Sequence, residues 1–415
     1  MKFWYRLGLK ALDLFLPVLA LSGEKMKKFS EGRKGIFMRI SKFRNDNPGD
    51  LAWFHVASLG EYEQAKPVIH ELKKRNPKLL IAVSFFSPSG YEPTSSKPQE
   101  NVDFITYLPL DLKSNAENFV SLLNPSFSVF VKYDIWYEHI MALKERGIPV
   151  FLISALFRPT QRYFKGDGFF QNLLKQFDHI FTQDESSISL LDKIHYSNHT
   201  LAGDTRFDRV AENAKNPKPF PQLKTWIGQK QTIVLGSVWE EDMKILIPLI
   251  NANPEFKWII APHDLDQGKM REWIKRISLR SAFYSKAGWN DSPNVLFLDT
   301  IGMLSSVYQF AKIAYVGGAF GSGLHNILEP LGFHVPVIFG KVRLDSKFPE
   351  AKISQDKGCA FSVEDLKSLR LTFENLQDEK VYEKAREGAE SWLAENLGAA
   401  RKICNTMDLI LQDER

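Results

Sequence analysis

The chain has 415 residues, which suits two domains of about 200 residues each. Its 44% hydrophobic and 25% charged residues are typical of a globular protein, and the formal net charge of +5 favours anionic partners such as a nucleotide or an anionic lipid. Only two cysteines are present, far apart in the sequence, which argues against a disulfide framework or a zinc site.

The first 35 residues predict a segment that lies at a membrane surface. Residues 3–21 read FWYRLGLKALDLFLPVLAL, and their longest uncharged part, 14–23, is about half of the ~20 residues that span a bilayer. Aromatic residues at positions 3–5 and flanking lysines favour an interfacial helix on an anionic leaflet. A helix packed on the protein's own core is one alternative, and a cleaved signal peptide is another.

The first half, residues 36–215, alternates short apolar runs with amphipathic stretches. This alternation predicts a parallel sheet covered by helices, in which ligands bind beyond the carboxyl ends of the strands. The predicted strands are 52–58, 79–85, 103–108, 128–131, 150–154 and 179–182, and the clearest predicted helices are 62–74 and 135–144.

Glu61 closes the first predicted strand-to-helix junction, His55-Val-Ala-Ser58-Leu-Gly60-Glu61. At the N-terminus of the following helix a carboxylate is favoured by the helix dipole. It is also a candidate general base, because a carboxylate within about 3 Å of an attacking hydroxyl can take its proton. The residues alone leave both roles open.

A proline-rich segment, 214–221, predicts the linker between the two domains, because three prolines in five residues fit neither a helix interior nor a central strand. A second sheet is predicted after it, with strands near 232–237 and at 258–261, 295–298, 313–316 and 335–339. Residues 364–412 are predicted to be mostly helical.

The stretch from Ile313 to Gly340 predicts a strand, a glycine-rich turn, a short helix and a second strand. Four glycines allow a left-handed backbone or the close approach of a ligand: Gly317, Gly318, Gly321 and Gly323. A helix beginning near His325 and Asn326 would present free N–H groups to a phosphate. Glu329, one turn further on, could accept hydrogen bonds from ribose hydroxyls. The alternative is an ordinary turn whose glycines serve packing.

Together these patterns resemble the bacterial 3-deoxy-D-manno-octulosonic acid (Kdo) transferases, glycosyltransferase family 30. H-x-x-S-x-G-E at 55–61 resembles the family motif whose Glu is the catalytic base. G-G-x(4)-G-x-H-N-x-x-E-P at 317–330 resembles the stretch that holds the CMP part of CMP-Kdo. Further segments along nearly the whole chain resemble family motifs: 84–90, 107–111, 132–136, 203–208, 236–241, 261–263, 299–304 and 396–400.

The resemblance implies an α/β fold of the GT-B type, with two Rossmann-like domains facing a cleft. It assigns 1–35 to the membrane interface, 36–215 to acceptor binding, 216–395 to nucleotide-sugar binding and 396–415 to a helix that returns to the first domain. It implies Glu61 as the catalytic base. Donor-binding residues would be Ser237, His263, Gly318, Gly321, Gly323, His325, Asn326 and Glu329, and acceptor-side or supporting residues would be Ser58, Gly60, Ser87, Ser89, Lys132 and Asp134.

Several positions depart from the family pattern, among them Ser154 in place of Asn and Leu156 in place of Arg. Asp134 stands where the family has Glu, the Arg that precedes the family's His is absent before His263, and Met303 replaces a Glu. A shorter carboxylate at 134 puts a direct contact from that position in question, although a water could bridge the gap.

The implied activity is an inverting transfer of Kdo from CMP-Kdo to the lipid A precursor, lipid IVA, in lipopolysaccharide biosynthesis at the cytoplasmic side of the inner membrane. We expect no metal and no cofactor other than the donor. Another GT-B enzyme, such as a UDP-sugar transferase or an epimerase, is one alternative, and a non-catalytic membrane-associated binding protein is a second. Nucleic-acid binding is not expected, because the basic residues are dispersed without interleaved aromatics.

Overall fold

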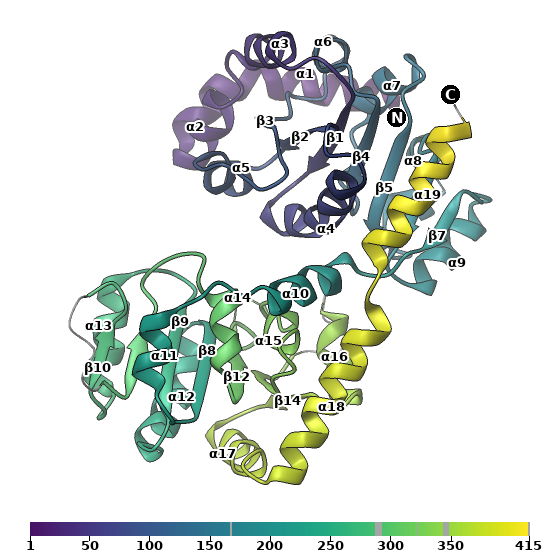
Figure 1. The fold of residues 1–415 in the computed structure, drawn as a ribbon. Helices are drawn as coiled ribbons and strands as arrows, with labels where there is room; N and C mark the ends of the chain where they lie inside the picture. Colours follow the sequence, from purple (N-terminus) through teal and green to yellow (C-terminus); the bar gives the residue numbers. More distant parts are fainter. Residues whose placement is uncertain (167, 287–292, 322, 343–347, 414–415) are drawn as a thin grey trace. The chain divides into compact units, whose positions relative to one another are not determined.

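The computed structural model describes residues 1–415 except 167, 287–292, 322, 343–347 and 414–415. The chain forms two compact units (Figure 1). Unit 1 contains Met1–Arg209 and Gly398–Arg415, and unit 2 contains Val210–Leu397. The division falls within helix α10 (Thr205–Lys215), and so lies before the proline-rich segment that was predicted as the linker.

Unit 1 is built on a parallel sheet of seven strands in the order β3-β2-β1-β4-β5-β6-β7. The six predicted strands are present, and a short seventh strand at the edge was missed. Their bounds are β1 (Leu51–Val56), β2 (Leu80–Phe85), β3 (Phe104–Tyr107), β4 (Phe127–Val131), β5 (Val150–Ala155), β6 (His179–Thr182) and β7 (His199–Leu201).

Helices cover both faces of this sheet, so the side chains of central strand β1 alternate between two cores. Trp53 packs in the core under α3, α6 and α7, whereas Phe54 packs under α4 and α19. A strand buried on both faces reads as a continuous apolar run, which makes the buried polar residue His55 an exception within β1. The helices are α3 (Ile36–Asp46), α4 (Leu59–Arg75), α5 (Pro88–Ser95), α6 (Lys113–Leu123), α7 (Tyr137–Lys144), α8 (Gly168–Leu174), α9 (Glu185–Lys193), α19 (Ala399–Asp413) and the 3-10 turn η2 (Arg162–Phe164).

The N-terminal segment packs on unit 1 as α1 (Lys2–Leu19), η1 (Ala20–Ser22) and α2 (Glu24–Glu31). Tyr5 donates a hydrogen bond to Asp111, and Arg6 forms a bidentate pair with the buried Glu138 at 2.5 and 2.9 Å. Arg33, just after α2, donates to three backbone carbonyls, and its burial lowers the pKa of the guanidinium to about 9. The first 35 residues are therefore anchored to the body of unit 1.

The outward side of α1 and η1 is nevertheless apolar. Its exposed hydrophobic side chains are Phe3, Trp4, Leu7, Leu14, Phe15, Val18, Leu19 and Leu21. Among the residues that the structure describes, no helix is long and apolar enough to cross a membrane. The helix thus packs one apolar side inward and presents a second one to its surroundings.

Unit 2 contains a second parallel seven-stranded sheet, ordered β10-β11-β9-β8-β12-β13-β14. The edge strands β10 and β14 were not predicted. The strands are β8 (Thr232–Val238), β9 (Lys257–Pro262), β10 (Ser281–Phe283), β11 (Val295–Phe297), β12 (Ile313–Val316), β13 (Val337–Gly340) and β14 (Ala360–Val363).

Two apolar clusters again flank the sheet of unit 2. One lies under α12, α13 and α17, and the other under α11 and α14. The helices are α11 (Pro221–Ile227), α12 (Glu240–Ala252), α13 (Gln267–Arg276), α14 (Leu304–Val307), α15 (Leu328–Leu331), α16 (Pro349–Asp356), α17 (Leu366–Asn375), α18 (Glu379–Asn396) and the 3-10 turn η4 (Tyr308–Phe310).

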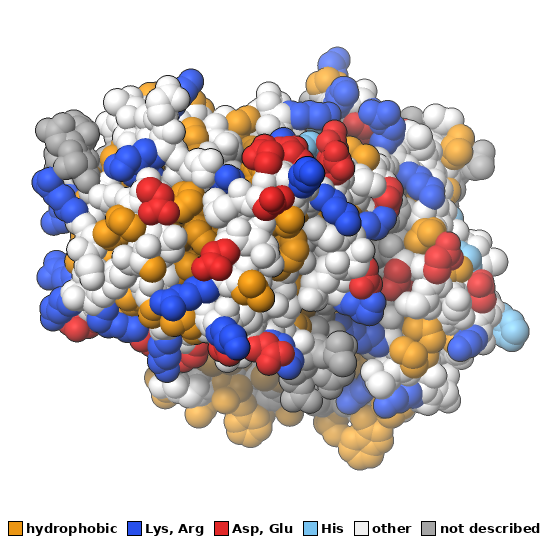
Figure 2. All heavy atoms as spheres, turned by 90° about the horizontal axis from the view of Figure 1, so that it is seen from below, with side chains coloured by type: hydrophobic (Ala, Val, Ile, Leu, Met, Phe, Trp, Pro, Cys, Tyr) orange, Lys and Arg blue, Asp and Glu red, His pale blue; other side chains and the backbone are white. Residues whose placement is uncertain are grey.

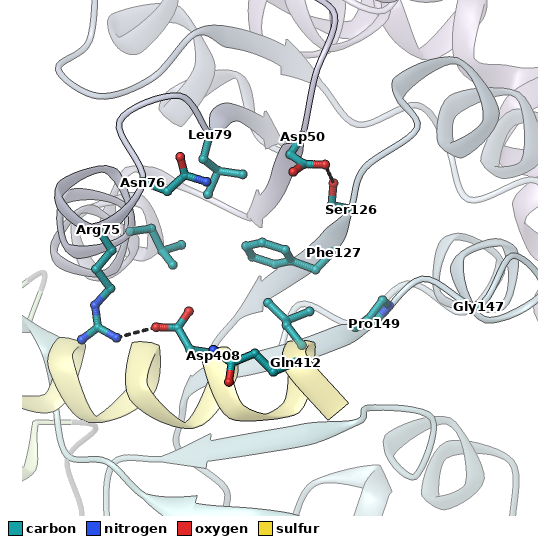
Figure 3. A pocket seen from close by; sticks show the side chains of 12 residues that line it. Asp50, Arg75, Asn76, Leu79, Ser126, Phe127, Gly147, Pro149, Asp408 and Gln412 are labelled. Carbon is teal, nitrogen blue, oxygen red and sulfur yellow. Dashed lines mark hydrogen bonds and ion pairs between the residues drawn. The ribbon is translucent and has the colours of Figure 1, made fainter. Parts of the chain in front are cut away.

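A cavity of about 330 Å³ opens in unit 1 between α4 and α19 at the amino ends of the strands (Figure 3). Its charged groups already have partners, because Arg75 pairs with Asp408 at 2.7 Å and Asp50 accepts a hydrogen bond from Ser126 at 3.0 Å. Ligands of open parallel sheets bind at the opposite edge. We therefore place the candidate site at the carboxyl ends of the strands.

Candidate active site

Glu61 lies in the first turn of α4, directly after strand β1. Ser58, the residue before the helix, donates its hydroxyl to one carboxylate oxygen of Glu61, and Lys132 Nζ lies 3.9 Å from the other, Oε1. The Glu61 side chain is 15% exposed. A hydroxyl donor and an ammonium group both stabilise the ionised form of a carboxylate, which is the form that a general base requires.

Lys132 reaches Glu61 from the neighbouring strand. It follows β4, which pairs with β1, and its φ of 70° places a non-glycine residue in the left-handed region. Such a conformation costs energy and persists where the surroundings enforce it. Here the Lys132 N–H donates to the Ile153 carbonyl at 2.8 Å, so the sheet continues to hold the backbone while the side chain turns toward Glu61.

Asp134 makes direct contacts despite its short side chain. Its Oδ2 lies 2.8 Å from His55 Nε2 and 3.1 Å from Trp136 Nε1, and its side chain is 22% exposed. Trp136 in turn stacks on Phe86 with the ring centroids 4.6 Å apart. The shorter carboxylate at 134 thus reaches His55 directly, without a bridging group.

The remaining unit 1 candidates lie at the same edge of the sheet. Ser87 caps α5 by accepting a hydrogen bond from the Ser89 N–H at 3.3 Å, and the two hydroxyl oxygens are 2.8 Å apart. The Ser87 N–H donates to the Ala57 carbonyl, which ties this loop to the end of β1. Gly60 is exposed in the first turn of α4. These residues border the Glu61 site, but part of their polar capacity is used by the protein itself.

In unit 2, three aromatic side chains stack where strands β8, β9 and β12 end. The His263 ring lies 4.3 Å from Trp239 and 4.4 Å from His325, at interplanar angles of 21° and 23°. Trp239 Nε1 donates to His325 Nε2 at 2.9 Å. Burial, and then the neighbouring His263, lower the pKa of His325 to about 4. His325 is therefore neutral at pH 7 and carries its proton on Nδ1.

The glycine turn is held by a buried carboxylate that the sequence analysis did not single out. Asp242 Oδ2 accepts the N–H groups of Gly318 and Trp239 at 3.0 and 2.9 Å, and Oδ1 accepts the Tyr315 hydroxyl at 2.9 Å. Burial raises the pKa of Asp242 even though these donors oppose the rise. A Cβ at Gly317 would lie 2.6 Å from Asp242 Oδ2, so this position has to be glycine.

The predicted helix start near His325 is wrong. The N–H groups of Gly321 and Gly323 donate to the Gly318 carbonyl, and that of His325 donates to the Gly317 carbonyl, so the turn closes on itself. The following helix, α15, begins only at Leu328 and has four residues. The N–H groups of Gly318, Gly321, Gly323 and His325 are thus used within the protein, and Ser322 lies outside the described residues.

Asn326 and Glu329 interact across the start of this short helix. Asn326 Oδ1 accepts the Leu328 N–H at 3.1 Å, and its amide donates to Glu329 Oε1 at 3.3 Å. Ser237 takes a left-handed φ of 52° within β8, at the point where the register with β9 shifts. It does not cap the next helix, because α12 begins at Glu240 with Trp239 as its N-cap.

The structure therefore gathers the predicted residues into two groups, one in each unit. Glu61, Ser58 and Lys132 are in contact, and Asp134 is joined to His55. His263 and His325 are stacked, whereas the contact that joins them, Trp239, was missed. Asp242 directly follows the segment 236–241, which resembles a family motif, and it could have been found from that position. Within the described part of the chain, no group of three or more His, Cys, Asp or Glu could hold a metal ion.

Comparison with known sequences gives a consistent family. The family model described as 3-deoxy-D-manno-octulosonic-acid transferase (kdotransferase) matches residues 32–209, which include the whole Glu61 site. The 3-deoxy-D-manno-octulosonic acid transferase of Aquifex aeolicus is 28% identical over 349 residues, 81% of this chain and 89% of that protein. That of Chlamydia trachomatis serovar A is 27% identical over 365 residues, 83% of this chain and 82% of that protein.

Solved structures agree on the fold. The UDP-GlcNAc 2-epimerase of Neisseria meningitidis superposes with a TM-score of 0.61 at 17% identity, over 86% of this chain and 98% of that one. MurG of Acinetobacter baumannii gives a TM-score of 0.56 at 14% identity, over 87% of this chain and 99% of that one. Identities this low carry the fold alone. In sequence the chain is thus similar to the 3-deoxy-D-manno-octulosonic acid (Kdo) transferases, through the family model over 32–209 and through relatives that match 81–83% of the chain, and its fold is of the GT-B type.

Proposed function

We propose that this chain transfers Kdo from CMP-Kdo to a hydroxyl of the lipid A precursor lipid IVA, with inversion at the anomeric carbon. The acceptor oxygen forms a bond to the anomeric carbon of Kdo while the bond from that carbon to the phosphate oxygen of CMP breaks. The electron pair leaves with CMP, and the hydroxyl proton passes to Glu61. A phosphate leaving group needs no protonation, so the reaction requires one base and no second acid.

The observation that carries this proposal is the setting of Glu61. Its carboxylate is fixed by Ser58, lies beside the Lys132 ammonium and keeps partial exposure at the ligand edge of unit 1. A carboxylate that served only as a first-turn helix residue would need neither the hydroxyl donor nor an ammonium aimed from a strained backbone on another strand.

The donor side of the proposal rests on unit 2. His325 is neutral and keeps Nδ1–H as a donor, and the exposed His263 ring is stacked beside it. Donors aimed at a departing phosphate stabilise the charge that develops on it. Asn326 and Glu329 remain the proposed contacts to the ribose. Because Asp242 and the turn's own carbonyls occupy most of the glycine N–H groups, we assign the glycines to shaping the site rather than to holding the phosphate.

A membrane-surface location is proposed from α1. The outward hydrophobic side chains of α1 and η1 are followed by Lys25, Lys27 and Lys28 in α2. Apolar side chains flanked by lysines suit the cytoplasmic surface of an anionic bilayer, which is where a lipid acceptor would be met. On the face drawn in Figure 2, basic and acidic side chains are mixed, so this face carries no large patch of one sign.

The test is a transfer assay with purified protein, CMP-Kdo and lipid IVA. CMP release is measured, and the mass of the product lipid is determined by mass spectrometry. Glu61→Gln keeps the size of the side chain and can still accept the Ser58 hydroxyl, but it cannot take a proton. We expect a loss of about 10²–10⁴-fold in kcat with CMP binding unchanged. Glu63→Gln, two residues further along the same helix, is the matched control.

Three outcomes would overturn the proposal. Glu61→Gln within a few-fold of wild type would remove Glu61 from the reaction. Release of UDP from a UDP-sugar, without turnover of CMP-Kdo, would reassign the donor. A wild-type protein that binds CMP but yields no glycosylated lipid would favour a binding protein.

A further inference from the structure

Two of the sequence motifs meet in a buried chain of hydrogen bonds inside unit 1. Trp53 Nε1 donates to Ser84 Oγ at 2.8 Å, Ser84 Oγ lies 2.9 Å from His55 Nδ1, and His55 Nε2 lies 2.8 Å from Asp134 Oδ2. Trp53, His55 and Ser84 are all fully buried. They belong to adjacent strands, since β1 pairs with β2 and, on its other side, with β4, which leads to Asp134.

Trp53, the first residue of this series of hydrogen bonds, determines which atom donates in each of the bonds that follow. An indole N–H can only donate, so Ser84 Oγ accepts from Trp53 and has one proton of its own to give. The nearest acceptor for that proton is His55 Nδ1 at 2.9 Å, whereas the Phe54 carbonyl is at 3.5 Å. Nδ1 therefore accepts, and the ring proton resides on Nε2, which donates to Asp134.

One alternative is a doubly protonated His55. It would require Nδ1 to donate to Ser84 and Ser84 to donate over 3.5 Å to the Phe54 carbonyl. A hydrogen bond that long is weak. A neutral ring protonated on Nδ1 instead would let Nε2 accept the Trp136 indole N–H at 3.0 Å, but it would set an unprotonated nitrogen 2.8 Å from the Asp134 carboxylate oxygen. The neutral Nε2–H form avoids that repulsion, and the Trp136 indole then donates to Asp134 Oδ2 at 3.1 Å.

The series of hydrogen bonds ends at Asp134, a carboxylate at the carboxyl-end edge of the unit 1 sheet. Asp134 Oδ2 receives two donors, His55 Nε2–H and Trp136 Nε1–H. Within the part of the chain that the structure describes, Oδ1 has no hydrogen-bond partner, and the side chain is 22% exposed. Lys132, two residues earlier, reaches Glu61. Oδ1 is thus an acceptor with a fixed direction on the edge of the sheet that carries the proposed base.

We propose that His55 is a positioning residue, set in its Nε2–H tautomer by Ser84 and Trp53, that holds Asp134 to accept a hydrogen bond from a hydroxyl of the acceptor sugar. This inference rests on the proposed function, because it assumes that a sugar acceptor binds at the ligand edge of unit 1. The shorter side chain at 134 is thereby explained, because the carboxylate is held by the His55 ring and the Trp136 indole.

The first arm of the test does not depend on activity. The chain has nine histidines, so ¹⁵N-histidine labelling with assignment by loss of one signal in His55→Gln isolates this ring. We expect the Nδ1 resonance of an unprotonated nitrogen and the Nε2 resonance of a protonated one between pH 6 and 8. A protonated Nδ1 in the wild type would overturn the assigned direction of the chain.

The second arm measures steady-state kinetics with each substrate varied in turn. His55→Leu removes the donor to Asp134, and we expect kcat/KM for the lipid acceptor to fall about 10–100-fold, the effect of one hydrogen bond to a charged group, with KM for CMP-Kdo unchanged. His55→Gln restores a side-chain N–H and should recover most of the loss. Ser84→Ala should fall between the two, and Ser128→Ala, a buried serine of the neighbouring strand, is the control.

The outcomes separate this inference from the proposed function. A folded His55→Leu protein with unchanged acceptor kcat/KM, or with an equal loss for CMP-Kdo, would overturn the positioning role while leaving Kdo transfer intact. A wild-type protein without transferase activity would overturn the proposed function. The labelling experiment would still show in which direction the hydrogen bonds between Trp53 and Asp134 run. If His55→Leu does not fold, His55→Gln and Ser84→Ala carry the kinetic comparison.

Discussion

Replacing Asp242 tests how the glycine turn of unit 2 is held in place. In the wild type this single carboxylate accepts three donors: the N–H groups of Trp239 and Gly318 and the hydroxyl of Tyr315. Asp242→Ala leaves all three without an acceptor in a buried site. Asp242→Asn can keep its oxygen toward the two N–H groups and donate its amide to the Tyr315 oxygen.

The two variants should therefore differ strongly in stability. Each buried donor left unpaired costs about 1–3 kcal/mol, and three of them, partly relieved by water entering the space of the lost carboxylate, give about 3–5 kcal/mol for Asp242→Ala. Asp242→Asn keeps both N–H groups paired and gives the Tyr315 oxygen a donor, and only the Tyr315 O–H loses its acceptor, so its cost should be about 1–2 kcal/mol. Urea unfolding at pH 7 measures both values, and CMP titration by calorimetry shows whether the turn still binds nucleotide.

The difference in stability between the wild type and Asp242→Asn should also depend on pH in a defined direction. Burial raises the pKa of Asp242, so the folded chain takes up a proton at a higher pH than the unfolded chain, in which Asp titrates near 3.9. The wild type should therefore gain stability relative to Asp242→Asn as the pH falls through the raised value toward about 4, and lose that gain as the pH rises again.

An exposed aspartate of the same unit provides the control. Asp266 accepts the N–H groups of Gly268 and Lys269 at the start of α13, and Asp266→Ala should cost about 1 kcal/mol, as a lost helix cap does. The reasoning is refuted if Asp242→Ala unfolds within about 1 kcal/mol of Asp266→Ala, or if Asp242→Ala and Asp242→Asn are equally stable.

Three further predictions concern other parts of the molecule. Lys132→Met should lower kcat/KM for Kdo transfer about fivefold, because a partly buried ion pair of this kind contributes about 1 kcal/mol; Lys66→Met, beside Glu63 on α4, is the control, and equal activities would contradict the role of Lys132. Burial lowers the pKa of His325 to about 4, so the folded ring stays neutral while the unfolded chain gains a proton near pH 6.5; unit 2 should lose stability from about pH 6.5 to 4, and His325→Gln should flatten this part of a calorimetric melting series, whereas parallel curves would contradict it. Trp4→Ser combined with Leu14→Ser should weaken sedimentation with anionic vesicles at least severalfold, since each side chain removes about 1.5–3 kcal/mol of apolar burial; Leu371→Ser on α17 should have no effect, and unchanged sedimentation of the double variant would rule out α1 as the contact.

Local sequence patterns were sufficient for most of the secondary structure. Apolar runs bounded by glycines and polar residues predicted six strands of unit 1 and five of unit 2, because a strand that is buried on both faces is a continuous run of apolar residues. The strands β7, β10 and β14 were missed. They are short edge strands that are only partly buried, so they lack the continuous apolar run of the strands inside each sheet.

The position of Glu61 is also a local property. A Ser followed three residues later by a Glu, just after an apolar run, places the carboxylate in the first turn of a helix whatever the rest of the chain does. The start of α15 was predicted wrongly for the opposite reason. The hydrogen bonds that return from Gly323 and His325 to Gly318 and Gly317 keep those residues in a turn, and helical hydrogen bonding begins only after Asn326 caps Leu328.

Contacts between strands could not be obtained from any local pattern. His55 and Asp134 are 79 positions apart, and Trp239 and His325 are 86 apart, yet each pair is within hydrogen-bond distance. The order β2-β1-β4 in one sheet and β9-β8-β12 in the other brings these residues together at strand ends. The sequence determined which strands carry polar residues at their carboxyl ends. Strand order determined which of those ends are neighbours, because it is fixed by how the helices bury both faces of each sheet.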